Sequence, residues 1–144
     1  MPRPESQLYR DIVLDHARRP RNAGRLPQPD RHATVVNPLC GDELCVDLKL
    51  ENDLIRDVRF LVRGCAISCA AASMLSEQII GLTLSRVAEL EQHWLNAIKG
   101  TESDLPEELE ALTPLLSVRN HPHRQSCARL PWDGLRALMA SSTT

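Results

Sequence analysis

Three cysteines and one aspartate, far apart in the chain, set the strongest constraint on its fold. Cys40 and Asp42 lie in NPLCGDE, Cys65 in RGCAISC and Cys127 in HRQSCARLPW. Only a folded domain can bring these side chains together, and once together they offer three thiolates and one carboxylate. That set suits a tetrahedral zinc ion or an iron–sulfur centre, and the carboxylate would be its replaceable ligand. Spacing alone leaves a second interpretation open, in which the cysteines are inert, buried residues.

The hydrophobic pattern predicts one domain spanning residues 1–144, with an α+β fold. Residues 32–37, 43–51 and 57–63 have the alternation of consecutive strands, and the polar face of the second strand carries Glu43, Asp47, Lys49 and Glu51. Helical periodicity covers residues 6–19, 66–80 and 83–99, a short helix near Pro106, and a last helix from about Cys127 or Pro131 to Met139. Helices must cover the apolar face of the sheet, which gives a two-layer sandwich with a three-stranded antiparallel sheet.

The cysteines fall where the chain changes direction. Gly41 can adopt positive φ, so the thiolate and the carboxylate on either side of it can converge on one ion. Cys65 lies where the third strand passes into a helix. Because proline is tolerated in the first turn of a helix but not deeper, Pro131 predicts that the last helix begins near Cys127. Both thiols would then lie near positive helix ends, which favour the thiolate.

Composition argues against several classes of partner. A formal net charge of −2, with two tryptophans, one tyrosine and one phenylalanine, offers neither a basic surface nor stacking platforms for nucleic acid. The sequence has no apolar signal region and no stretch of bilayer length, so we expect no membrane association. Five cysteines, an odd number, argue against a disulfide framework, and we expect a cytoplasmic protein with reduced thiols.

Four stretches resemble the U-type iron–sulfur cluster assembly proteins, the family of IscU, SufU and the N-terminal domain of NifU. They are LYRDIVLDHARRPRNAG, NPLCGDELCVDLKL, VRGCAISCAAASMLSE and HPHRQSCARLPWDGL, which occur in the family's order and together span most of the chain. The resemblance implies a SufE/NifU-like fold for the chain. It also implies that the family's metal ligands are Cys40, Asp42, Cys65 and Cys127.

Within the family the chain is most similar to SufU. It has an extra helical portion at about residues 84–104, and Ser126 stands where IscU-like members have a histidine. SufU-like proteins imply zinc-dependent sulfur transfer: persulfide sulfur arrives from a pyridoxal-phosphate-dependent, SufS-like cysteine desulfurase and goes on to an apo iron–sulfur protein or a downstream scaffold. IscU-like proteins imply the alternative, a scaffold on which a labile [2Fe–2S] cluster is assembled. A purely structural zinc domain is a third possibility, with no sulfur acceptor.

Roles for single residues follow from the resemblance. We expect Cys40 to accept the sulfur, because it lies on a glycine-containing turn, with Cys127 as the alternative acceptor. Asp42 is expected to be the ligand most easily displaced, since zinc holds thiolates better than one carboxylate oxygen. Arg124 matches a family arginine near the site, where a cation would stabilise a thiolate or persulfide. Four other potential ligands are expected to take no part: Cys45, Cys69, His121 and His123.

Overall fold

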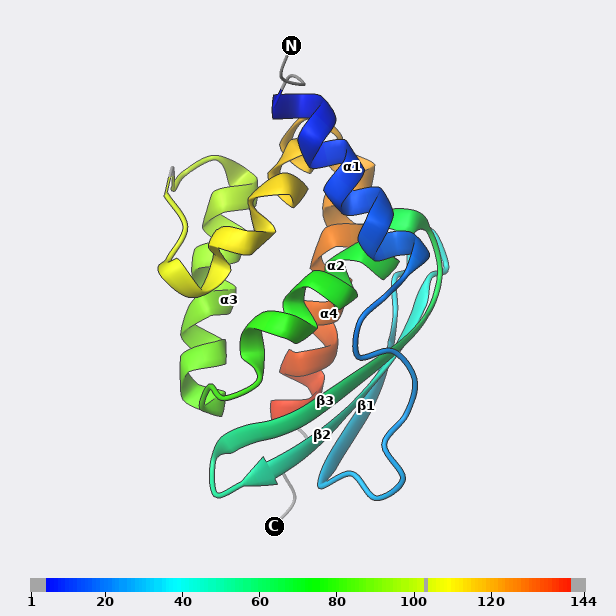
Figure 1. Cartoon of the computed structure of the whole chain (residues 1–144), viewed down its shortest axis with the longest axis vertical. Coiled ribbons are helices and arrows are strands. Elements are labelled where there is room, and N and C mark those ends of the chain that lie inside the picture. Colours follow the sequence, from blue (N-terminus) through cyan, green and yellow to red (C-terminus); the bar gives the residue numbers. More distant parts are fainter. Residues whose placement is uncertain (1–4, 103, 141–144) are drawn as a thin grey trace.

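The computed structural model describes residues 5–102 and 104–140, and its sheet is the predicted antiparallel meander. Strands β1 (Arg31–Val36), β2 (Glu43–Glu51) and β3 (Leu54–Arg63) lie in the order β1-β2-β3 (Figure 1). Leu44 of β2 pairs with Val35 of β1 and with Val62 of β3, so the central strand is held on both sides. The third strand begins three residues before its predicted start, because the tight turn at Asn52, with φ of 58°, lets pairing resume at once.

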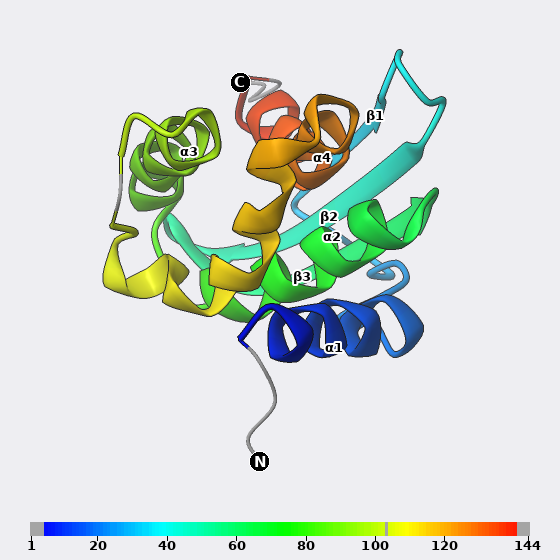
Figure 2. The ribbon, with the colours of Figure 1, turned by 90° about the horizontal axis from the view of Figure 1, so that it is seen from above.

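The helices cover one face of this sheet, as predicted. Helices α2 (Ala66–Ile79) and α4 (Pro122–Ala140) lie directly against the strands (Figure 2). Around them pack α1 (Glu5–Arg18), α3 (Leu84–Lys99) and a 3₁₀ segment, η1 (Glu107–Asn120). No helix among the described residues is long and apolar enough to cross a membrane.

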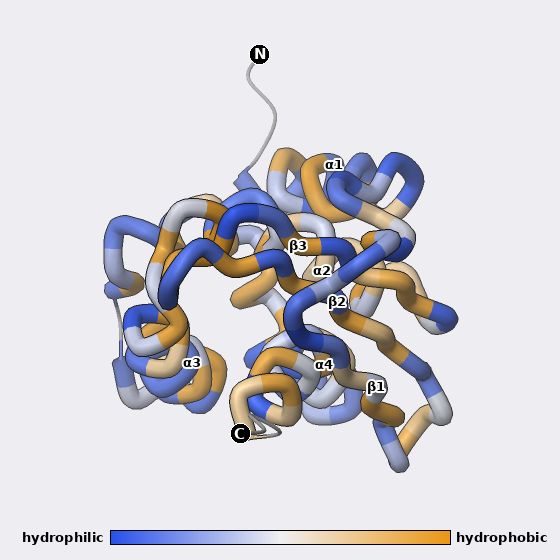
Figure 3. The backbone as a smooth tube through the Cα atoms, turned by 90° about the horizontal axis from the view of Figure 1, so that it is seen from below, coloured by the Kyte–Doolittle hydropathy of each residue, from blue (hydrophilic) through white to orange (hydrophobic). Residues whose placement is uncertain are grey.

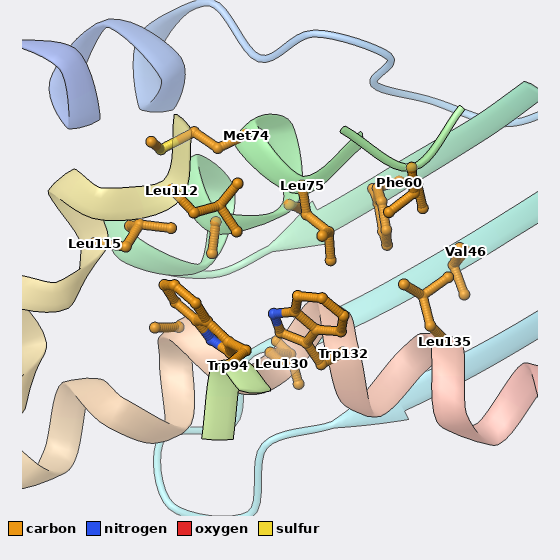
Figure 4. Close-up of a cluster of buried hydrophobic side chains, with 14 of the residues drawn as sticks. Val46, Phe60, Met74, Leu75, Trp94, Leu112, Leu115, Leu130, Trp132 and Leu135 are labelled. Carbon is orange, nitrogen blue, oxygen red and sulfur yellow. The ribbon is translucent and has the colours of Figure 1, made fainter. Parts of the chain in front are cut away.

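The core between the two layers is mainly aliphatic. Leu44, Val46 and Leu48 of β2 point into it and are fully buried. Trp94 of α3 and Trp132 of α4 stack in its centre, with ring centroids 6.5 Å apart (Figure 4). Hydrophobic and hydrophilic segments alternate along the helices and strands, which is the pattern of elements buried on one side (Figure 3). The packed core fixes where α2 and α4 meet the end of the sheet.

The connector between α1 and β1 (residues 19–30) covers part of the other face of the sheet. It bonds to β3, where the Gly24 N–H donates to the Phe60 carbonyl (3.0 Å), and later to β2, where the Asp30 N–H donates to the Leu48 carbonyl (2.7 Å). Between these points the Leu26 N–H donates to the Asp47 carboxylate (2.9 Å). Asp47 is therefore fully buried, although the alternation of β2 assigned it to the polar face.

The C-terminal third differs from the prediction. A 14-residue 3₁₀ segment replaces the short helix expected near Pro106, and α4 begins at Pro122 rather than near Cys127. Pro131 thus lies inside the helix, where its missing N–H leaves the Cys127 carbonyl without its helical partner. Pro131, Trp132 and Leu135 are all buried, and their burial offsets this loss. A rule based on local sequence does not include this contribution.

Candidate metal centre

The turn between β1 and β2 presents Cys40 and Asp42 at one end of the sheet. The Asn37 N–H donates to the Asp42 carbonyl (2.7 Å), and the Gly41 N–H donates to the Asn37 carbonyl (2.7 Å). Gly41 has φ of 79°, the left-handed conformation predicted for it. Cys40 is exposed at the tip of this turn, whereas Asp42 is buried beneath it.

Cys65 is the N-cap residue of α2, in agreement with its predicted place at a helix start. The Ser68 N–H donates to its sulfur at 3.5 Å, so the thiol satisfies one of the free amides of the first turn. The Cys65 side chain is exposed. Its sulfur thus lies at the positive end of the α2 dipole.

Cys127 reaches the site from α4, but not from the start of the helix. It is the sixth residue of α4 and only 6% exposed, so the predicted position at the positive helix end is wrong. Burial, together with the neighbouring Cys65 thiol, raises the pKa of Cys127 to about 12. Without a cation beside it, this thiol therefore stays protonated.

Three of the four predicted ligands meet in one group. The ligand atoms of Cys40, Asp42 and Cys127 all lie within 4.8 Å of one another, and the Cys40 and Cys127 sulfurs are 3.9 Å apart. Cys65 borders the group, since its N–H donates to Asp42 Oδ2 at 3.2 Å. Burial alone would raise the pKa of Asp42, but hydrogen bonds from the Ser68 hydroxyl and from Cys65 outweigh it and lower that pKa.

The donor set fits a tetrahedral thiophilic ion. Two thiolates bound to one tetrahedral zinc at about 2.3 Å must lie roughly 3.8 Å apart, and the observed separation of the Cys40 and Cys127 sulfurs is 3.9 Å. Asp42 adds an ionised oxygen donor, and Cys65 offers a third sulfur at the rim. The same sulfur-rich set could also hold iron in an iron–sulfur cluster.

The other candidate residues lie around or away from this group. Arg124 is exposed in the first turn of α4, three residues before Cys127. Among the described residues, neither His121 nor His123 belongs to a group with metal-binding geometry. Cys45 lies on the other face of the sheet, 3.4 Å from the Thr34 hydroxyl, and burial raises the pKa of Cys69.

Residues of the two cysteine motifs that sequence reasoning left without a role also build the site. Ser68 and Asn37 are buried polar residues whose side chains bond to Asp42 and to α4, respectively. Gly64 lies directly against the Asp42 side chain. The one signal in the sequence is that short residues occupy these places in NPLCGD and RGCAIS.

Known proteins share both the sequence and the fold. A model of the NifU-like N terminal domain matches residues 8–112. The zinc-dependent sulfurtransferase SufU of Bacillus subtilis is 34% identical over 89% of this chain and 86% of its own. The iron–sulfur cluster assembly scaffold protein IscU of Streptococcus pyogenes is 31% identical over 95% of this chain and 86% of its own.

Solved structures agree with these relatives. FiSufU from Fervidobacterium islandicum superimposes with a TM-score of 0.84 and 28% identity, covering 94% of this chain and 99% of its own. The N-terminal NifU-like protein of Brucella abortus also gives a TM-score of 0.84, at 24% identity and with 94% of each chain covered, and supports the fold alone. The expected α+β sandwich is therefore confirmed by independent structures.

Proposed function

The chain belongs to the family of NifU-like N-terminal domains, which act in iron–sulfur cluster assembly, and from this premise we propose that it is a zinc-dependent sulfurtransferase. One observation carries the proposal: an exposed thiol, Cys40, lies 3.9 Å from the Cys127 sulfur in a group completed by Asp42. Zinc would be held by Cys40, Asp42, Cys65 and Cys127, and when bound it would keep the thiols ionised at neutral pH.

Cys40 is the residue best suited to accept sulfur. Its thiolate would attack the outer sulfur of a persulfide on the partner, forming a new S–S bond and releasing the partner's cysteine as a thiolate. Exposure favours Cys40 over Cys127, whose buried thiol has a pKa of about 12. Arg124, exposed near the start of α4, would stabilise the negative charge of the incoming persulfide.

The sulfur donor would be a pyridoxal-phosphate-dependent, SufS-like cysteine desulfurase, and the sulfur would pass to an apo iron–sulfur protein or a downstream scaffold. Two exposed apolar side chains on and beside the turn that carries Cys40 (residues 37–42, here called the acceptor turn) support contact with a protein. Leu39 in the turn is 75% exposed, and Val36 at the end of β1 is 55% exposed. Because the proposed chemistry needs free thiols, we expect it to take place in the reducing cytoplasm.

Desulfurase turnover tests the proposal. The zinc-loaded protein should increase sulfide release by a cysteine desulfurase from the same organism, and Cys40→Ala should abolish the increase. Cys45→Ala is the matched control, because it removes a partly exposed thiol from the other face of the sheet. Stimulation that survives in Cys40→Ala would refute the assigned acceptor, and no stimulation by the wild-type protein would refute sulfur transfer.

A second candidate function is a scaffold for a labile [2Fe–2S] cluster, the cargo rather than a resident cofactor. The mixed donor set favours it as well, since the oxygen of Asp42 among sulfurs would weaken the hold on a cluster. Anaerobic addition of ferrous iron and sulfide should then give a coloured protein that passes its cluster to an apo-ferredoxin. A protein that stays colourless under these conditions would exclude this candidate.

A further inference from the structure

The Asp42 carboxylate is held by two donors at the start of α2. The Ser68 hydroxyl donates to Asp42 Oδ2 at 2.7 Å, and the Cys65 N–H donates to the same oxygen at 3.2 Å. Ser68 is fully buried. Its hydroxyl therefore has little water to compete for it, and the bond restricts rotation of the carboxylate.

Gly64 makes this close contact possible. A Cβ atom on Gly64 would lie 2.5 Å from Asp42 Cγ and 2.7 Å from Asp42 Oδ2, which is closer than such atoms can approach. The backbone of residue 64 thus forms a wall behind the carboxylate, and only glycine leaves room for Asp42 there. The Ser68 hydroxyl, the Cys65 N–H and the backbone of residue 64 therefore all restrain the Asp42 carboxylate on its Oδ2 side.

Cys40 has no such support. It is exposed, and Gly41 beside it lies in an open stretch of the turn, where even an added Cβ would meet no atom within 4 Å. Its sulfur is 3.9 Å from that of Cys127, itself a proposed ligand. The two neighbouring residues of one turn therefore differ: Asp42 is buried and held by two donors from α2, whereas Cys40 is exposed.

We propose that Ser68 is a positioning residue that fixes Asp42 through Oδ2 and so leaves Oδ1 as the oxygen that would bind the metal. This inference rests on the proposed zinc site and deepens it. Three contacts fixed by the fold offset the weaker bond of the oxygen, because a preorganised ligand loses little freedom on binding.

Metal binding by Ser68→Ala tests the inference without any activity assay. We expect its zinc affinity, measured by competition with a chromophoric chelator, to fall about 10- to 100-fold, the usual effect of losing a residue that orients a ligand. With cobalt in place of zinc, the visible absorption should weaken. The freed Oδ2 can then also bind, and five-coordinate cobalt absorbs less strongly than four-coordinate cobalt.

Ser76→Ala is the matched control. Ser76 is also fully buried on α2, but its hydroxyl donates to the Ser73 carbonyl, away from the site. It should keep the wild-type affinity and cobalt spectrum. Gly64→Ala provides a second route, because it displaces Asp42 without touching Ser68, and it should weaken binding at least as much.

The outcomes separate the two proposals. Wild-type affinity and spectrum in Ser68→Ala, or equal changes in Ser68→Ala and Ser76→Ala, would overturn the role of Ser68 and leave the zinc site standing. If Ser68→Ala does not fold, unchanged metal binding by Gly64→Ala would overturn it instead. A wild-type protein that binds neither zinc nor cobalt would refute the proposed function itself.

Discussion

Asn37 is the residue that joins the acceptor turn to α4. Its Oδ1 accepts from the Leu39 N–H (3.0 Å), and its Nδ2 donates to the Ser126 hydroxyl (3.0 Å). Asn37 is buried, and both bonds are partly shielded from water. Ser126, the residue before Cys127, thus has a hydrogen-bond partner in the turn.

Asn37→Ala should destabilise the metal-free protein by about 2 kcal/mol, because it removes two hydrogen bonds, one to the Leu39 N–H and one to the Ser126 hydroxyl. Ser126→Ala removes the other end of one bond and should cost only about 1 kcal/mol. The free energies of unfolding in urea measure both. Equal losses in the two variants would show that the Leu39 contact contributes nothing.

At the scale of helices and strands, the hydrophobic periodicity of the sequence predicted those features that depend only on residues close together in the chain. The three strands, the cap of α3 at Thr83 and its end at Gly100 follow the sequence rules closely. The start of α4 and the burial of Asp47 do not, because both depend on what another segment covers. In the same way, the four candidate ligands could be named from their motifs, whereas the hydrogen bond from Ser68 to Asp42 depends on the packing of α2 against the turn.

The connector across the sheet should depend on Asp47. Its carboxylate accepts from Arg25 Nε (2.8 Å) and from the Leu26 N–H, and His32 Nδ1 lies 2.6 Å away. Asp47→Ala should lower the free energy of unfolding by about 3 kcal/mol, since it leaves these donors unpaired. Asp30→Ala, at the exposed end of the same connector, should lower it by less than about 1 kcal/mol. Chemical denaturation of both variants decides the point, and similar losses would contradict it.

The interface between α1 and α2 should make stability depend on pH. His16 Nδ1 lies 2.7 Å from the Ser73 hydroxyl, and burial, with the nearby Arg21 cation, lowers the pKa of His16 from its ordinary 6.5 despite the opposing charges of Glu77 and Asp15. The unfolded chain then binds a proton at a higher pH than the folded chain does. Stability is therefore complete above about pH 6.5 and falls as the pH drops towards the folded pKa.

His16→Gln should remove this part of the pH dependence. Urea midpoints of the metal-free protein, compared at about pH 7.5 and about pH 5.5, should differ less in the variant than in the wild type. Asp42 and Asp47 also have lowered pKa values, but their contributions are lost only below their ordinary value of 3.8. The same loss of stability over this range in both proteins would exclude His16 as its source.

At the scale of the whole molecule, the proposed metal centre is where three parts of the chain meet. The turn after β1 supplies Cys40 and Asp42, the start of α2 supplies Cys65, and α4 supplies Cys127. The unfolded chain cannot hold these donors in one geometry, because the two ends of the set are 87 residues apart. Metal binding should therefore be coupled to folding of the entire domain, not to one local loop.

Zinc should raise the free energy of unfolding by an amount that grows with the logarithm of the ratio of the free zinc concentration to the dissociation constant. At free zinc about 100-fold above that constant the gain is about 2.7 kcal/mol, less any binding to unfolded cysteines. Because the pKa of Cys127 is about 12 in the metal-free protein, binding must release its proton, and the gain should increase with pH. Thermal unfolding with zinc or with a chelator, at two pH values, measures this. Cys127→Ala should lose most of the gain and Cys45→Ala should keep it, whereas an equal gain in both variants would place the stabilising zinc outside this site.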